Sequence, residues 1–506
     1  MTHCQQVRYD ASMRPKLLVC VTLLLFVPVF VSAQSSSTGG SFSISPETRD
    51  AARQLIGDSI LNGKAYEYDG HLADMIGPRL TGSANYMRAA DWVAREFRAL
   101  GLANVHTEDW TIPATWEPEV PATGRILKPV EHQLHIYSVG WSPSTRDKGV
   151  EGEVIHVASI LPADLDAQKA KLSGAIALLD DSSFGEKPSL DKIGIGLDRL
   201  RSFSPAAIFL RGGANGAENL TALTFSGTID AIPEAQIGAE DVSLLNRLLQ
   251  NGPVTVQFSF ANSIRKDVKV PNVIAEIPGR ELPGEVVIVG AHLDSWQPGT
   301  GAQDNGTGVA GVMEVARAIK ALGRAPRRTI RFILFGGEEQ GLLGSRAYAS
   351  SHVAEMPNID AVLITDTGAE PAKGWYVMGR EDERTPIAAL KPLLTGLGAD
   401  GVSSDTEFIF ETDHAAFDVL GVPALVLWND TDKYFRLHHK ASDTFDSVVQ
   451  KDLTQGAAVI AVTAYAIADG KEPFAPHLSP AEMQSMLQKS GNLDEYNFLK
   501  KSGLLP

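Results

Sequence analysis

Histidine and acidic residues gather in short clusters in the second half of the chain, and these are the groups that could do chemistry. They are His292 with Asp294, Asp304, Glu338 with Glu339, Asp366, and the adjacent pair His438 and His439. Imidazole nitrogens and carboxylate oxygens are zinc ligands, and manganese or cobalt can substitute at such sites. A carboxylate shared by two metal ions can hold them about 3.5–4 Å apart, where they activate water and stabilise an oxyanion. The residue types therefore indicate metal-assisted hydrolysis.

No single cluster is specific, but most of them follow a predicted strand. Beyond residue 271, continuous apolar runs alternate with segments of helical periodicity. The predicted strands are 285–290, 329–335, 359–366 and 423–427, and the predicted helices are 306–322, 342–352, 385–397 and 451–468. Repeated strand–helix units indicate an α/β fold with a mostly parallel sheet sandwiched by helices. Sites in such sheets lie at the carboxyl ends of the strands, so we expect the clusters to converge there.

The region before these units divides by composition. Residues 46–104 carry apolar positions at helical spacing, whereas residues 118–265 contain short β-branched runs, with helical patterns at 162–172 and 240–250. The early helices complete the main domain, which makes 118–265 a smaller α/β domain inserted into it. We therefore expect a signal peptide at 1–33, a catalytic domain in two parts at 34–117 and 266–506, and the insertion at 118–265.

The first residues read as a secretory signal. Arg14 and Lys16 precede an apolar run at 17–31, and Val31-Ser32-Ala33 supplies small residues for cleavage before Gln34. The run is shorter than the roughly 20 residues that a spanning helix needs, and a retained membrane anchor is the alternative. We expect export to the periplasm or the extracellular space, with no membrane attachment after cleavage.

Composition excludes several functional classes. The chain has 506 residues, 44% of them hydrophobic and 21% charged, which is ordinary for a folded protein and not for a disordered one. The formal net charge of −16 argues against a nucleic-acid partner, which would need a basic surface. Cys4 and Cys20 are the only cysteines, and both lie in the predicted signal peptide. The mature protein therefore has no disulfide framework, cysteine zinc site or thiol nucleophile.

Several motifs occur in an order that resembles a known family. They are His-Leu-Asp-Ser-Trp (292–296), Gly-Ala-Gln-Asp-Asn-Gly (301–306), Gly-Glu-Glu-Gln-Gly (337–341), Thr-Asp-Thr-Gly (365–368) and His-His-x-x-x-Asp-Thr (438–444). Together they resemble the dizinc exopeptidases of the bacterial leucyl aminopeptidase and glutamate carboxypeptidase type, and most closely the carboxypeptidase Q branch of secreted dipeptidases. The likeness includes Gly-Pro-Arg-Leu-Thr-Gly-Ser (77–83) and extends over the inserted region, which in that family is a protease-associated domain.

The resemblance implies two zinc ions per chain and a ligand set for each. One zinc would be held by His292, Asp304 and Asp366, and the other by Asp304, Glu339 and His439, with Asp304 bridging. Glu338 matches the general base, which takes a proton from metal-bound water and passes it to the leaving amine. The implied activity is hydrolysis of dipeptides or short peptides, and the implied assembly is a homodimer.

The resemblance also assigns supporting roles and leaves others open. Asp294 would orient the His292 ring, and the Asp304–Asn305 peptide would be cis. His438 stands where many relatives have a tyrosine that stabilises the oxyanion, and it either donates there or packs beside the site. His438 is also the alternative metal ligand, although the spacing to Asp443 and Thr444 favours His439. Trp296 either shapes the substrate pocket or packs in the core.

Three other functions compete with the dipeptidase. An aminopeptidase acting on longer peptides would use the same core, and the difference lies in which terminus the pocket recognises. Capture of a carboxylate would need a cation, for which Arg380 and Arg436 are the candidates. A metal-free receptor on the same scaffold is disfavoured because every ligand position carries a competent residue. A single-zinc glutaminyl cyclase would not explain the likeness across the inserted region.

Overall fold

The computed structural model describes residues 42–145, 148–185, 189–213, 226–405 and 408–506. The predicted signal peptide at 1–33 lies outside these residues. Within the described ranges, no helix is both long and apolar enough to cross a membrane.

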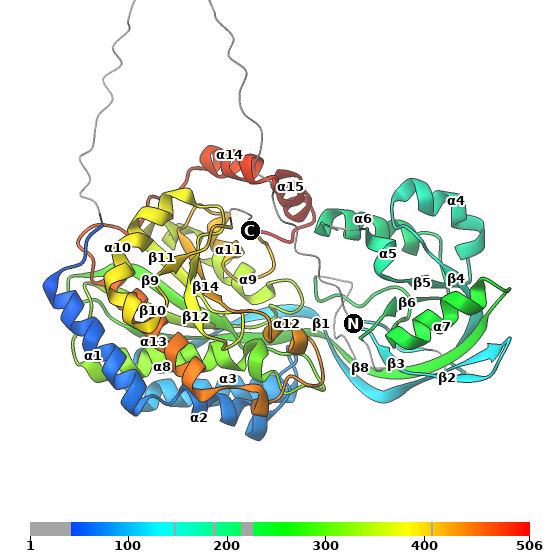
Figure 1. Cartoon of the computed structure of the whole chain (residues 1–506), viewed down its shortest axis with the longest axis horizontal. Coiled ribbons are helices and arrows are strands. Elements are labelled where there is room, and N and C mark those ends of the chain that lie inside the picture. Colours follow the sequence, from blue (N-terminus) through cyan, green and yellow to red (C-terminus); the bar gives the residue numbers. More distant parts are fainter. Residues whose placement is uncertain (1–41, 146–147, 186–188, 214–225, 406–407) are drawn as a thin grey trace, which may run out of the picture. The chain divides into compact units, whose positions relative to one another are not determined.

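Parallel strands form the centre of the sheet, as predicted (Figure 1). The strands β14 (Ala424–Asn429), β11 (Ile359–Ile364), β9 (Leu282–His292) and β10 (Arg328–Phe335) are neighbours in this order, and each adjacent pair is parallel. Antiparallel strands flank them, with β12 (Ala372–Tyr376) on β14 and β8 (Thr255–Ile277) on β10. β13 (Gly401–Val402) pairs with β12. The carboxyl ends of the parallel strands therefore all lie at one edge of the sheet.

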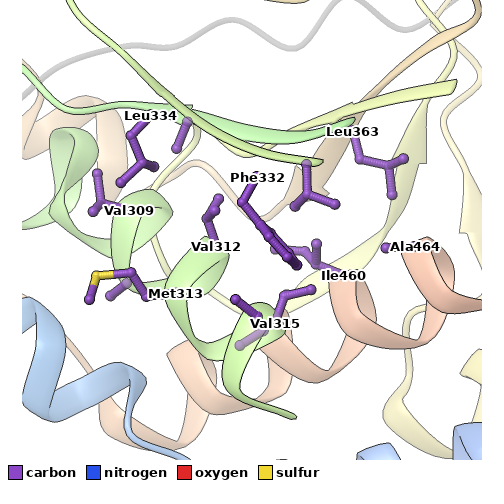
Figure 2. Close-up of a cluster of buried hydrophobic side chains, with 14 of the residues drawn as sticks. Val309, Val312, Met313, Val315, Phe332, Leu334, Leu363, Ile460 and Ala464 are labelled. Carbon is purple, nitrogen blue, oxygen red and sulfur yellow. The ribbon is translucent and has the colours of Figure 1, made fainter. Parts of the chain in front are cut away.

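The side chains of β9 alternate between two cores, as the period of a strand requires. Val287 and Val289 pack into a cluster with helices on one face of the sheet, whereas Val286 and Ile288 pack with helices on the other face. Figure 2 shows the first cluster, in which Phe332 of β10 lies among apolar side chains of the helices. The helices of the first face are α1 (Pro46–Asn62), α2 (Ala65–Gly70), α3 (Ala84–Ala99), α8 (Thr307–Leu322), α10 (Arg384–Leu394) and α13 (Gln450–Ala468). Those of the second are α9 (Leu343–Ser351), α11 (Ala415–Asp418), α14 (Pro480–Ser490) and α15 (Leu493–Lys501).

The helical region predicted over residues 46–104 is confirmed as far as Ala99, and a strand begins at Ala103. Serine side chains begin its first and third helices, since Ser45 accepts a hydrogen bond from the Thr48 N–H and Ser83 accepts one from the Tyr86 N–H. A π-helical turn at His71–Ile76 follows α2 and ends at Gly77, whose φ of 84° favours glycine. The loop between Gly77 and Ser83 returns the chain to the edge of the sheet where the parallel strands end.

Two long antiparallel strands cross both predicted boundaries of the insertion. β1 (Ala103–Lys128) pairs with β8 along its length, and the register places Pro118 opposite Asn262. The sheet continues beyond them through β4 (Val150–His156), β5 (Ile176–Leu179), β6 (Ala207–Arg211), β7 (Glu234–Ile237) and β3 (Ile136–Ser138), with β2 (His132–Leu134) on β1. The helices here are α4 (Pro162–Leu172), α5 (Asp181–Phe184), α6 (Leu190–Arg201) and α7 (Ala239–Leu249). The region has its own apolar clusters, and its division as a protease-associated domain stays a prediction.

Candidate metal centre

The predicted ligand residues come together at the carboxyl ends of the parallel strands. His292 is the last residue of β9, Glu338 and Glu339 follow β10, and Asp366 follows β11. Asp304 lies in a turn (Ala302–Gly306) that precedes α8, and the backbone is not helical at Asp304 and Asn305. His438 and His439 directly follow the short helix α12 (Tyr434–Leu437). The fold therefore brings together residues that are far apart in the sequence, from His292 to His439.

Asp304 is the centre of the arrangement because its two carboxylate oxygens face different histidines. Its Oδ1 lies 3.3 Å from Nε2 of His292, and its Oδ2 lies 3.4 Å from Nε2 of His439. On the first side, Nε2 of His292 is also 2.9 Å from Oδ1 of Asp366. On the second side, Nε2 of His439 is 2.9 Å from Oε2 of Glu339. The geometry thus presents two groups of N and O donors that share one carboxylate.

The donor set fits a bound cation. Asp304 and Glu339 are buried, yet Oδ2 of Asp304 and Oε1 of Glu339 have no hydrogen-bond partner in the described part of the chain. Leaving buried anionic oxygens without a partner is costly, and a metal ion removes that cost. Ligand atoms of His292, Asp304 and Glu339 lie within 4.8 Å of one another, and so do those of Asp304, His438 and His439. Nitrogen and oxygen donors at this spacing suit zinc.

The electrostatics of the site reflect this crowding of acids. Burial raises the pKa of Glu339 well above its ordinary value, and the neighbouring Asp304 raises it further. Burial also raises the pKa of Glu338, with the nearby Asp366 acting in the same direction and His292 opposing. Burial would lower the pKa of His292, but the charges of Asp366 and Glu338 outweigh it and raise that pKa well above its usual range. A cation at this position would compensate the surplus negative charge.

Two residues beside the ligands hold the acidic ligands in place. Asp443 accepts hydrogen bonds from the backbone N–H groups of Gln303 (2.7 Å) and Asp304 (3.0 Å). Asn305 donates from Nδ2 to the Thr365 carbonyl (2.8 Å) and to Oδ1 of Asp366 (3.1 Å). The Asp304–Asn305 peptide is cis, as predicted. No role of the Asn305 side chain was predicted from the sequence, although its place next to the shared aspartate was a usable signal.

The predicted role of Asp294 is divided between its backbone and its side chain. Nδ1 of His292 lies 3.0 Å from the backbone carbonyl of Asp294 and 3.7 Å from its carboxylate. A proton on Nδ1 can therefore be donated to the carbonyl, which leaves Nε2 facing Asp304 and Asp366. The Asp294 carboxylate instead accepts from the Thr81 hydroxyl (2.7 Å) and the Glu338 N–H (3.3 Å). Asp294 thus links the His292 ring to the loop that carries Glu338.

A buried arginine, Arg79, holds together the two loops that carry ligand residues. The Arg79 guanidinium is 0% exposed and donates to the carbonyls of Leu293 (2.9 Å), Thr300 (2.8 Å) and Gly301 (2.8 Å). Leu293 directly follows His292, and Gly301 begins the turn that carries Asp304. Burial lowers the pKa of Arg79, and nearby carboxylates, Asp69 first among them, act in the opposite direction. Arg79 therefore sets the relative position of two ligands without facing the substrate.

Replacing Arg79 by Lys is expected to weaken zinc binding about 10–100-fold, the usual effect of losing a group that orients ligands. Lysine keeps the positive charge, but a single ammonium cannot reach the three carbonyls that the planar guanidinium bridges. Competition with a chromogenic chelator measures the affinity. Arg88→Lys, an exposed arginine on α3, is the matched control. Unchanged zinc affinity in Arg79→Lys would show that the loops hold their positions without it.

His438 and Trp296 take different places around His439. The His438 ring stacks on the His439 ring with 3.7 Å between centroids, and its Nε2 is 3.5 Å from Oδ2 of Asp304. Burial, followed by the charge of His439, lowers the pKa of His438 to about 4, so this imidazole is neutral at neutral pH. Trp296 is buried, with its ring 6.0 Å from that of His439 and 6.1 Å from that of Trp141.

A cavity of about 540 Å³ opens at the ligand residues. Glu338 and His438 line it, and the lining is mostly apolar, with Tyr376, Met378 and Phe410 among the residues. Trp296 is not among the described residues that line it, and no described lysine or arginine lines it either. The lining includes acidic residues beyond the ligand set, Asp405 and Glu411.

The two arginines considered for carboxylate capture lie elsewhere. Arg380 is 0% exposed and is paired with Asp382 (2.9 Å) and Asp418 (3.4 Å) in a buried network. Arg436 is exposed on α12 and is not part of the described cavity lining. The structure therefore does not bring either candidate cation into the cavity.

Comparison with known proteins agrees with the motifs. The model of Peptidase family M28 matches residues 272–464, which hold every predicted ligand. Carboxypeptidase Q of Rattus norvegicus is 31% identical over 437 residues, covering 84% of this chain and 90% of the relative. The chain belongs to peptidase family M28. This M28 peptidase is a zinc-dependent exopeptidase, as its residues predicted.

Further relatives of this M28 peptidase include proteins with different names. It is 27% identical to a probable lipoprotein aminopeptidase of Mycobacterium tuberculosis, over 76% of this chain and 80% of the relative. A peptidase M28 precursor from Shewanella amazonensis has a similar structure, with a TM-score of 0.75 at 28% identity, covering 86% of this chain and 99% of that one. The α/β fold with helices on both faces of its sheet is therefore confirmed.

Proposed function

We propose that this M28 peptidase hydrolyses dipeptides and short peptides that carry an apolar side chain, with two zinc ions at the shared Asp304. The observation that supports this most directly is the mostly apolar cavity that ends on the ligand residues. Its volume of about 540 Å³ is in the range of small-ligand pockets, which suits a dipeptide. His292, Asp304 and Asp366 would hold one ion, and Asp304, Glu339 and His439 the other.

Glu338 is the proposed general base. Zinc, when bound, supplies Lewis-acid chemistry that polarises a peptide carbonyl and acidifies water. The Glu338 carboxylate lines the cavity beside the ligands and would accept a proton from the attacking water. It would then deliver that proton to the nitrogen of the leaving amine. The hydrogen bond from its own N–H to Asp294 holds the Glu338 backbone during both transfers.

The sign of charge in the cavity supports recognition of a free amine. Bound zinc would offset the charge of the ligand carboxylates, but Asp405 and Glu411 also line the cavity, and their charges would attract a cationic α-amino group and repel a free carboxylate. Neither Arg380 nor Arg436 is among the described residues that line the cavity, so neither offsets this negative charge. We therefore propose a dipeptidase or aminopeptidase that reads the amino terminus, although its relatives include proteins named carboxypeptidase Q.

Blocking one terminus of a dipeptide at a time tests this assignment. Acetylation of the amine of Leu-Ala is expected to lower kcat/KM at least about 100-fold, because it removes the positive charge that the acidic residues of the cavity attract. Amidation of the carboxyl end is expected to change kcat/KM less than about tenfold. Cleavage of the acetylated peptide together with loss of the amidated one would overturn the proposal and establish a carboxypeptidase.

We also propose that the protein is exported and forms a homodimer. The charged residues, apolar run and small residues before Gln34 support a cleaved secretory signal, so that the enzyme would act in the periplasm or outside the cell. The resemblance to the carboxypeptidase Q branch supports a homodimer.

A further inference from the structure

The last turn of the chain lies against the catalytic cavity. Leu499 of α15 and the following Leu504 and Leu505 line the same cavity as Glu338 and His438. We call these three leucines the C-terminal wall. We propose that the C-terminal wall sets the size of the substrate side chain that the enzyme accepts, an inference that rests on the proposed function.

The C-terminal wall is held by contacts on its outer side. Leu499 and Leu505 are buried in the same apolar cluster as residues of β9, β10 and α9. The Leu504 N–H donates to the Leu499 carbonyl at 2.7 Å, which closes the turn after α15. Arg346 of α9 donates from Nη2 to the Gly503 carbonyl. A wall fixed at both ends by packing and hydrogen bonds cannot move away cheaply when a large side chain enters.

A second support reaches α15 from the inserted region. Figure 1 shows α15 beside α6, and the two helices are in contact. Phe498 of α15 fills the space above Gly194 of α6, where a Cβ atom would lie 2.7 Å from the Phe498 ring. Phe498 precedes Leu499 in the chain, so this contact limits how far α15 can retreat from the cavity.

Side chains from the sheet also line the cavity. Tyr376 of β12 and Val426 of β14 line it, together with Met378. Val426 and Met378 are buried, so their side chains are held in place as well. A substrate side chain in the cavity would therefore meet residues of the sheet as well as the C-terminal wall. Unlike Tyr376 and Val426, the C-terminal wall comes from outside the sheet, so its side chains can be shortened without removing a strand residue.

The test uses the full-length enzyme loaded with zinc and two series of dipeptides, Xaa-Ala and Ala-Xaa, with Ala, Leu, Phe or Trp at Xaa. In the double variant Leu504→Ala/Leu505→Ala, kcat/KM for Trp relative to Ala is expected to rise about tenfold or more in one series. The reverse variant, Leu504→Phe, is expected to lower the ratio for Phe and Trp in that same series while cleavage of Ala-Ala persists. The two changes in opposite directions identify the wall as the determinant of size.

Leu493→Ala is the matched control, because Leu493 belongs to α15 and packs in the same cluster but does not line the cavity. The control is expected to keep the wild-type ratios, so a change there as large as in the double variant would overturn the inference. Ratios that stay at the wild-type values in both Leu504→Phe and the double variant would also overturn it. If the double variant does not fold, Leu504→Phe decides alone. A wild-type enzyme that cleaves no dipeptide would refute the proposed function instead, which separates the two failures.

Discussion

Replacing Glu338 by Gln is expected to lower kcat about 10²–10⁴-fold while bound zinc stays at the wild-type level. Glutamine has the size of glutamate but cannot accept the proton of the attacking water. Its backbone N–H still donates to Asp294, so the loop after β10 should keep its position. Steady-state kinetics on a dipeptide, combined with metal analysis of the dialysed protein, measures both quantities.

The adjacent Glu339 provides the contrast for that experiment. Oε2 of Glu339 lies 2.9 Å from Nε2 of His439, and its Oε1 has no hydrogen-bond partner among the described residues, as expected of a ligand. Glu339→Gln is therefore expected to lose zinc as well as activity. Full activity in Glu338→Gln would refute the assignment of the base, and loss of zinc from it would show that Glu338 is a ligand.

Replacing Asp304 by Asn is expected to abolish activity and to remove zinc from both ligand groups. The two Asp304 oxygens face His292 on one side and His439 on the other, at 3.3 and 3.4 Å. Asparagine keeps the shape, but it has one oxygen and no charge, so it cannot serve both sides. Zinc per chain, measured after dialysis against a weak chelator, is expected to fall from two toward zero.

Asp366→Asn is the matched comparison, because Asp366 is 2.9 Å from His292 and belongs to one group only. This variant is expected to keep one zinc per chain. Retention of two zinc ions by Asp304→Asn would refute the shared carboxylate. Equal losses in the two variants would show that the ions bind as a single cooperative unit.

Most of the ligand clusters could be predicted because they are tied to a local signal. His292 and Asp366 each lie within a few residues after a continuous apolar run. Such runs indicate strands buried on both faces. Parallel strands linked by helices place their carboxyl ends together, so the convergence of these clusters followed from periodicity alone. The boundaries of β9, β10, β11 and β14 accordingly agree with the prediction to within a few residues.

The long pair β1 and β8 was missed for an equally physical reason. Pro118 and Pro121 interrupt the pattern of β1, and proline ordinarily marks a turn or an edge. The pairing that makes this segment a strand comes from β8, with Pro118 opposite Asn262. Both predicted boundaries of the insertion, at residues 118 and 265, therefore fall inside continuous strands and not in linkers.

The positions of two arginines, Arg79 and Arg380, could not be predicted from local sequence patterns. The sequence alone determined which side chains can bind metal and at which edge of the sheet they meet, because strand periodicity and chain order are local properties. It could not show that Arg79 would bind the loops that carry the ligands. It also could not show that Arg380 would pair with Asp382 and Asp418 in the interior instead of facing the substrate. Only the tertiary structure decided these positions, and with them the C-terminal wall, because such contacts depend on how distant segments pack and on which charges become buried together.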